Sequence, residues 1–251
     1  MSEFGQLRLN WAQPSEFPTL GPGEIHVWAV PQEGESPTSD DVAAMLSADE
    51  LARAADFVID PPRRAFVATR LALRSLLGRY LDVPPREVSI AIDPHGKPRL
   101  MNGDLCFNVS HSGTLGLIAV TRGSEIGIDV EQLRPVERLM DIAERQFHPQ
   151  EQSAIRAASP EQSTATFLRC WTRKEAVIKS IGAGLNYPLA AFRVMGSQIT
   201  ERSSQVVELS AQGDVPDSRC FLCDVEPCDA YAAAVATQTA QQSVLGFTYS
   251  P

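Results

Sequence analysis

The sequence has no apolar run of about 18 residues and no basic stretch leading into an apolar one, so neither a membrane span nor a signal peptide is expected. Its five cysteines are an odd number, which argues against the disulfide framework of a small secreted protein. These absences favour a cytoplasmic protein with no membrane partner.

Positive charge is also scarce. The 251 residues carry a formal net charge of −9, whereas a nucleic-acid-binding protein needs a basic surface, so no nucleic-acid partner is expected. The basic residues are unevenly spread, however, and a crowded group of them could form a local pocket for a small anion. This group is Arg63, Arg64, Arg70, Arg74 and Arg79.

Two common kinds of site are missing as well. No phosphate-binding loop or dinucleotide fingerprint occurs, because "GAGL" follows a helical pattern rather than a strand. Cys220, Cys223 and Cys228 hint at a metal site, but no histidine or second cysteine pair follows at zinc spacing. We interpret them as apolar positions of a strand, with a metal site as the alternative.

The chain is expected to form two similar α+β halves. Residues 1–23 are rich in Pro and Gly and predict an irregular lead-in, and "EIHVWAV" predicts a strand over 24–30. Ser47 is a helix N-cap signal, and Pro61-Pro62 separates that helix from the next. "EIHVWAV" and "EIGIDVE" begin 101 residues apart, as do the helical pieces that start at Phe66 and Phe167. We therefore predict halves at 24–123 and 124–251, with a ligand cleft between them.

The stretch "GIDVE" holds a charge conflict. Ile126, Ile128 and Val130 alternate as in a buried strand, so Asp129 and Glu131 point to one common face. Two close carboxylates repel unless a cation or a proton lies between them, and Mg²⁺ prefers carboxylates plus substrate phosphates. The alternative is an exposed strand end whose acids pair with Arg134 or Arg138.

A second motif, "FLRCWTRKEAVIKSIGAGL", predicts a helix from Phe167. Glu175 interrupts an apolar stripe that includes Trp171, and Lys179 follows one turn later. Glu175 could complete a metal site and Lys179 could bind a phosphate. The alternative is a Glu–Lys surface pair worth a few tenths of a kcal/mol.

Two shorter motifs are weaker. In "FNVSHSG", the hydroxyls and imidazole of Ser110, His111 and Ser112 follow a strand and suit phosphate oxygens. A nucleophilic serine is disfavoured because no G-x-S-x-G elbow is present, and simple turn chemistry is the other alternative. Lys97 in "HGKPRL" lies in an ordinary hairpin turn.

In this order, "GKP", "FNVSHS", "GIDVE" and "WTRKEAVIKSIGAGL" resemble the 4'-phosphopantetheinyl transferase superfamily, and within it the large surfactin-synthetase-type enzymes. The resemblance runs from about Ile25 to Thr237. It implies a pseudo-duplicated α+β fold, with the active site between the halves of a monomer. It also implies transfer of the phosphopantetheine arm of coenzyme A to a serine of an acyl or peptidyl carrier protein, which releases adenosine 3',5'-bisphosphate.

The resemblance also implies roles for individual residues. Asp129, Glu131 and Glu175 match acids that bind Mg²⁺, with Mn²⁺ as a substitute, and Glu175 is also the base for the serine. Lys179 matches the lysine that contacts the coenzyme A phosphates. The remaining matches, on the nucleotide side, are Lys97, Ser110, His111, Arg64 and Arg53.

One departure and two rival functions accompany this assignment. "ADELARAADF" offers only Arg53 where the family is often more basic, which weakens the expected phosphate contacts there. The same acids and lysine would suit a metal-dependent nuclease or phosphohydrolase. A protein that binds coenzyme A or a carrier without activity is the second rival.

Overall fold

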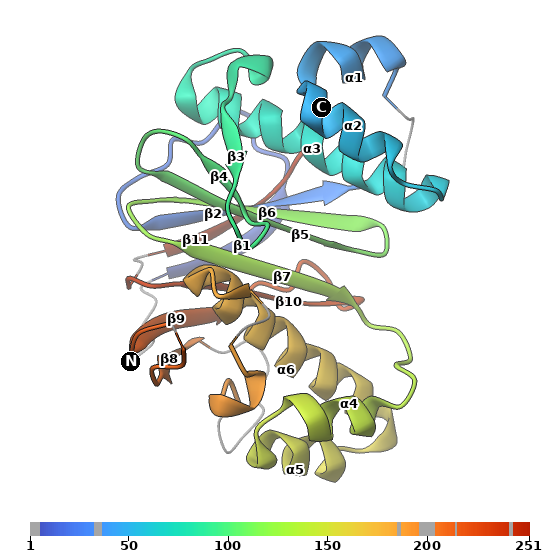
Figure 1. The fold of residues 1–251 in the computed structure, drawn as a ribbon, viewed down its shortest axis with the longest axis vertical. Coiled ribbons are helices and arrows are strands. Elements are labelled where there is room, and N and C mark those ends of the chain that lie inside the picture. The colour runs from blue at the N-terminus through green and yellow to red at the C-terminus, as the bar shows by residue number, and fades with distance from the viewer. Residues whose placement is uncertain (1–5, 33–36, 185–186, 196–203, 214, 241–242) are drawn as a thin grey trace.

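Two β-sheets lie face to face, and one long helix covers the outer side of each (Figure 1). The computed structural model describes residues 6–32, 37–184, 187–195, 204–213, 215–240 and 243–251. In chain order the elements are β1 (Gln6–Ala12), β2 (Glu24–Pro31), α1 (Ser39–Met45), α2 (Ala48–Ala55), α3 (Asp60–Leu81), η1 (Pro85–Glu87), β3 (Ile90–Ile92), β4 (Pro98–Leu100), β5 (Leu105–Ser112), β6 (Leu115–Arg122), β7 (Ile126–Gln132), α4 (Leu139–Gln146), α5 (Pro149–Ala157), α6 (Pro160–Ile181), η3 (Leu189–Ala191), β8 (Ser204–Leu209), β9 (Ser218–Asp224), β10 (Tyr231–Thr237) and β11 (Ser243–Thr248).

The first sheet has the strand order β1-β11-β2-β6-β5 and is covered by α3. Leu73, Leu76 and Leu77 lie on the buried face of α3 and pack against residues of β2 and β6. The predicted cap at Ser47 is confirmed, because its side chain accepts from the amide of Glu50. Pro61-Pro62 occupies the first turn of α3, where a missing amide hydrogen costs nothing, so these prolines begin the helix.

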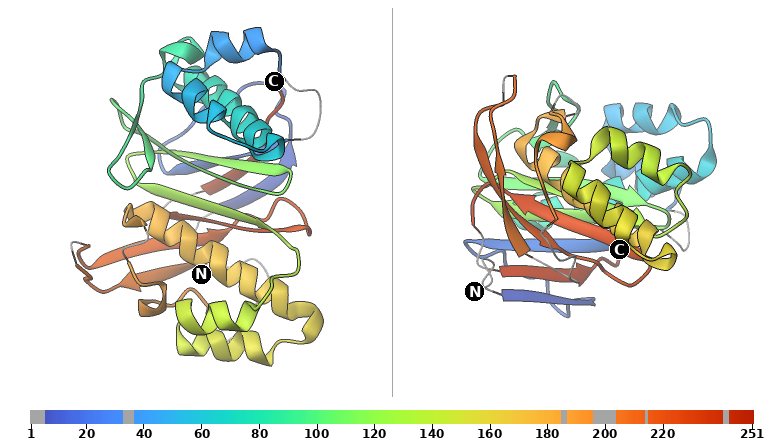
Figure 2. Two further views of the ribbon diagram at one scale, coloured as in Figure 1. Left: turned by 45° about the vertical axis from the view of Figure 1, so that its right-hand side comes forward. Right: turned by 90° about the horizontal axis from the view of Figure 1, so that it is seen from below.

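The second sheet, in the order β7-β10-β9-β8, repeats the plan of the first. Each half has a strand, a long helix and a hairpin, and β2-β6-β5 corresponds to β7-β10-β9 with antiparallel neighbours throughout. α3 and α6 occupy equivalent places on opposite outer sides (Figure 2, left). The prediction of a pseudo-duplicated α+β fold is therefore confirmed.

A shared apolar core holds the two sheets together. Ile25 and Val27 of β2 pack in it with Ile126 and Ile128 of β7, and all four are fully buried. Because side chains alternate along a strand, the other residues of β7 face away from this core, toward α6. The strand thus fixes which side of the sheet carries Asp129.

The prediction of an irregular lead-in was wrong for residues 6–12, which form β1; residues 1–5 lie outside the described residues. β1 pairs in parallel with β11, and β11 pairs in parallel with β2. The strand after Thr237 therefore completes the sheet of the first half, where Val244 is buried in the shared core. No local pattern predicts this pairing, since its partners lie at opposite ends of the sequence.

None of the helices in the described ranges has both the length and the apolar character that crossing a membrane requires.

Candidate active site

The acid pair lies on an edge strand, β7, on the side that faces α6. Asp129 has only 5% of its surface exposed, and Glu131 is half-buried. The alternative of an exposed strand end paired with arginine is therefore wrong for Asp129. Arg138 instead pairs with Asp141, at 2.6 Å.

α6 approaches β7 very closely because Gly127 has no side chain. A Cβ at this position would lie 2.1 Å from the carbonyl oxygen of Ala176 and 2.4 Å from the amide nitrogen of Ser180. Both distances are far below van der Waals contact. The glycine of "GIDVE" thus lets α6 bring Glu175 and Lys179 over the strand.

Lys179 neutralises part of the acid pair. Its Nζ donates to Asp129 Oδ1 at 2.7 Å and to the carbonyl of Ile128 at 3.1 Å. The alternative of a Glu175–Lys179 surface pair is wrong, since the ammonium pairs with Asp129 across the helix–strand interface. Sequence spacing placed Lys179 on the correct face but could not supply its partner.

β5 contributes the "SHS" residues from the first half of the chain. Ser110 Oγ donates to Asp129 Oδ1 at 2.8 Å, and Ser112 Oγ donates to Glu131 Oε2 at 2.7 Å. His111 lies between these two serines on β5 and is exposed. Partial desolvation lowers the pKa of His111, and the charge of Lys179 lowers it further. The charge of Asp129 opposes this effect but does not cancel it.

The carboxylates are arranged to favour a positive ligand. Burial raises the pKa of Glu175, and the charges of Asp129 and Glu131 raise it further. Burial also raises the pKa of Glu131, although its hydrogen bond from Ser112 opposes this. Asp129 Oδ2 is buried and has no hydrogen-bond partner among the described residues. Such an oxygen is costly to leave unpaired, so it suits a cation.

The three predicted metal ligands lie near enough for Asp129 and Glu131 to raise the pKa of Glu175, but they are not drawn in around one common point. Within the described part of the chain, no three His, Cys, Asp or Glu side chains are gathered closely enough to hold a metal ion. Cys220 and Cys223 are buried in β9, whereas Cys228 is exposed. The apolar-strand interpretation is confirmed for Cys220 and Cys223.

Lys97 lies where the start of β7 meets the end of α6. Its Nζ donates to Glu125 Oε2 at 2.9 Å, to the carbonyl of Ile126 at 2.9 Å and to the carbonyl of Lys179 at 2.8 Å. An ammonium group has three hydrogens, so these protein acceptors use all of them. The Lys179 carbonyl belongs to the last turn of α6, which lacks intrahelical donors. Lys97 thus joins the hairpin, β7 and α6.

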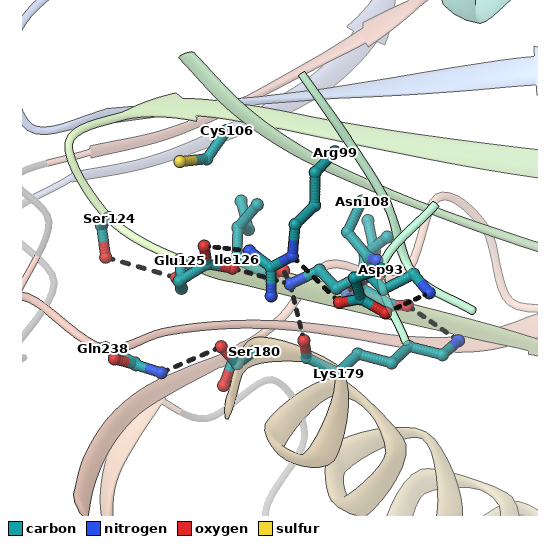
Figure 3. Close-up of polar contacts among 12 residues, drawn as sticks. Asp93, Arg99, Cys106, Asn108, Ser124, Glu125, Ile126, Lys179, Ser180 and Gln238 are labelled. Carbon is teal, nitrogen blue, oxygen red and sulfur yellow. Dashed lines mark hydrogen bonds and ion pairs between the residues drawn. The ribbon is translucent and has the colours of Figure 1, made fainter. Parts of the chain in front are cut away.

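Arg99, which sequence reasoning did not single out, reinforces this junction. Its guanidinium bonds to Asp93, at 3.0 Å, and to Glu125, so the hairpin turn is tied to the start of β7 (Figure 3). In the close-up these residues lie beside Lys179 and Ser180, at the end of α6. The sequence shows that Arg99 follows the turn, but nothing near it indicates that Glu125 is its partner.

The two predicted arginines lie on α2 and α3, and no hydrogen bond or ion pair within the described residues joins them to the acids. Arg53 is exposed and 4.0 Å from Asp56. Arg64 is 3.1 Å from Asp60 and lines a pocket of about 480 Å³ between α1, α2 and α3. The structure thus gathers Ser110, Asp129, Glu131, Glu175 and Lys179 but leaves both arginines apart.

Two family models together match most of the chain. A model described as the 4'-phosphopantetheinyl transferase superfamily matches residues 125–236, and one described as the N-terminal part of 4'-phosphopantetheinyl transferase matches residues 35–123. The two matches meet at the start of β7, between the duplicated halves.

Individual relatives agree with these matches. The chain is 42% identical over 183 residues to "4'-phosphopantetheinyl transferase HetI" of Nostoc sp., which is 71% of this chain and 77% of the relative. It is 30% identical over 197 residues to a 4'-phosphopantetheinyl transferase of Bacillus subtilis. The aligned residues cover 78% of this chain and 84% of the relative. A Xenopus laevis protein, "L-aminoadipate-semialdehyde dehydrogenase-phosphopantetheinyl transferase", is 26% identical over 196 residues, or 73% and 62%.

Proposed function

This chain belongs to the 4'-phosphopantetheinyl transferase superfamily, and on that premise we propose that it moves the phosphopantetheine arm of coenzyme A to a serine of an acyl or peptidyl carrier protein. The chain is a transferase enzyme; its carrier and its surfactin-synthetase-type subgroup are part of the proposal. The observation that carries it is that Asp129, Glu131, Glu175 and Lys179 of the second half lie close together. Ser110 and Ser112 of β5, from the first half, bond to two of these acids.

We assign Asp129, Glu131 and Glu175 as the residues that would hold Mg²⁺ or Mn²⁺. Two of these acids carry raised pKa values, and the unpartnered Asp129 Oδ2 is an oxygen that a hard cation would satisfy. A bound ion supplies positive charge to the pyrophosphate oxygens of coenzyme A. Lys179 adds a further positive charge at Asp129, in reach of a phosphate that enters beside the acids.

Glu175 is placed to act as the general base. Burial raises its pKa, and the charges of Asp129 and Glu131 raise it further, which makes it a stronger proton acceptor than an exposed carboxylate. The carrier's serine hydroxyl gives its proton to Glu175, and its oxygen bonds to the phosphorus next to pantetheine. The bond between that phosphorus and the bridging oxygen breaks, so adenosine 3',5'-bisphosphate leaves. Positioning and charge stabilisation supply the rest of the catalysis.

The nucleotide end of coenzyme A would lie on the first half. Ser110 and His111 are on β5, next to the acids, while Lys97, Arg53 and Arg64 are the further candidates for its phosphates. The pocket beside Arg64 supports an anion there. Lys97 would have to exchange one of its three protein acceptors for the ligand.

A cytoplasmic monomer is also part of this proposal, and the architecture supports the monomer. β5 comes from the first half, and β7 and α6 come from the second, so one chain supplies all the site residues. A subunit partner is therefore unnecessary for the site. We also keep as a proposal that the chain divides near residue 124 into two halves.

Replacement of the acids tests the proposal. Asp129→Ala and Glu175→Ala should each lower phosphopantetheine transfer by at least about 100-fold, because a charge-stabilising ligand or the base is lost. Glu137→Ala removes an exposed acid from the following loop and should keep normal activity. Circular dichroism should show all three variants folded. Full activity in either site variant would mean that the site is misassigned.

A further inference from the structure

β5 and β7 run side by side at the edges of two different sheets, and side chains join them. β5 ends the first sheet and β7 begins the second, so no shared backbone ladder is assigned to this pair. Unpaired edge groups are costly when buried. The amides of β7 that face β5 therefore need other acceptors.

Three side chains of β5 provide these acceptors in strict register. Asn108 Oδ1 accepts from the amide of Ile128 at 2.9 Å. Ser110 Oγ accepts from Val130 at 3.4 Å, and Ser112 Oγ accepts from Gln132 at 3.2 Å. Both series advance by two residues, so the acceptors share one face of β5 and the donors share one edge of β7. We call these three residues the seam ladder.

The two serines of the seam ladder do more than replace a backbone ladder. A hydroxyl has one hydrogen, and when its oxygen accepts from an amide, that hydrogen is free for another partner. Ser110 directs it to Asp129 Oδ1 at 2.8 Å, and Ser112 directs it to Glu131 Oε2 at 2.7 Å. The same rungs that join the halves therefore orient the two carboxylates.

We propose that Ser112 is a positioning residue that holds Glu131 in the orientation needed to bind the divalent cation. The inference rests on the proposed function, in which Glu131 is a cation ligand. Ser112 anchors one carboxylate oxygen, Oε2, by its 2.7 Å hydrogen bond, and so restricts how the carboxylate can turn. Groups that orient metal ligands in this way commonly change metal affinity by about 10- to 100-fold when removed.

Asn108 offers a matched control. It is a buried rung of the same ladder, but its amide oxygen bonds to the backbone and contacts no carboxylate through that bond. Asn108→Ala should therefore weaken the seam and lower stability without altering cation binding. Ser112→Ala should weaken both, whereas Ser112→Thr keeps the hydroxyl.

Cation binding is measured directly with Mn²⁺. The free Mn²⁺ signal in electron paramagnetic resonance is followed as full-length protein is titrated in the presence of coenzyme A without carrier. We expect Ser112→Ala to raise the Mn²⁺ dissociation constant by about tenfold or more, Ser112→Thr to restore it, and Asn108→Ala to leave it unchanged. In activity assays, Ser112→Ala should need more Mg²⁺ but keep the KM for coenzyme A.

Two outcomes would overturn the inference. One is an unchanged Mn²⁺ constant in Ser112→Ala; the other is an equal weakening in Asn108→Ala, which would assign the effect to the seam alone. If Ser112→Ala does not fold, Ser112→Cys replaces it, since a thiol is a weak donor of similar size. A wild-type protein that neither transfers phosphopantetheine nor binds Mn²⁺ would instead refute the proposed function.

Discussion

Lys174 immediately precedes Glu175 in the sequence, but its side chain lies in the interior of the second half. It is fully buried and 2.8 Å from Glu151 Oε2, and it also donates to the carbonyls of Leu189 and Phe192 at 2.8 and 2.7 Å. One ammonium thus connects α6, α5 and the segment around η3. We predict that Lys174→Met is among the most destabilising single changes in the chain.

The magnitude follows from what the ammonium leaves behind. Breaking a buried ion pair by removing one partner costs about 3–5 kcal/mol, because an uncompensated charge stays buried. Glu151 would keep two backbone donors, His148 at 3.1 Å and Val194 at 2.7 Å, which limits its penalty. Two carbonyls would also lose a donor. We therefore expect a loss of about 4 kcal/mol, a large part of the 5–15 kcal/mol typical of a folded domain.

Urea unfolding of Lys174→Met, Glu151→Gln, their double variant and Arg156→Met tests this value. Lys174→Met should lose about 4 kcal/mol, and adding Glu151→Gln should recover part of it, since the double variant holds no unpaired charge. The exposed pair of Arg156 and Glu144, at 2.8 Å, is the control, and Arg156→Met should cost less than about 1 kcal/mol. A loss below about 1 kcal/mol for Lys174→Met, or fully additive effects in the double variant, would refute the reasoning.

Two further predictions concern pH and packing. Burial lowers the pKa of His26 from 6.5 to about 4, so the stabilisation is full above pH 6.5 and is lost as the pH falls toward 4. Between pH 7.5 and pH 5, urea unfolding should show that wild type loses about 2 kcal/mol more stability than His26→Asn. Equal losses in the two proteins would contradict this. Gly127→Ala should cost about 1–3 kcal/mol and reduce transfer, because its Cβ would push α6 away from β7. Normal transfer in Gly127→Ala would count against the close approach.

Local patterns predicted those parts of the site that depend on the period of a single strand or helix. Alternation along "GIDVE" placed Asp129 and Glu131 on one face of a strand, and helical spacing placed Glu175 and Lys179 one turn apart on a helix. The resemblance to the family, not the spacing, indicated that the helix and the strand share a site. The repeated order of strand, helix and hairpin predicted the duplicated fold. Each of these patterns depends only on neighbours a few residues apart.

The contacts between distant segments could not be predicted in this way. Nothing near Asn108 or Ser112 indicates that β5 lies against β7, and nothing near residue 6 indicates a parallel partner at residue 243. The buried role of Lys174 could not be predicted from its motif, because helical spacing does not identify Glu151 as its partner. These pairings follow from tertiary packing and become visible only in the folded chain.

The most direct test of the central claim is to analyse both products of one reaction. The protein is incubated with Mg²⁺, coenzyme A and several apo acyl and peptidyl carrier proteins, and intact carrier mass and adenosine 3',5'-bisphosphate are measured together. We predict that at least one carrier gains a single phosphopantetheine group and that the nucleotide appears in equal amount. Release of the nucleotide without any carrier adduct would indicate a phosphohydrolase and contradict the account.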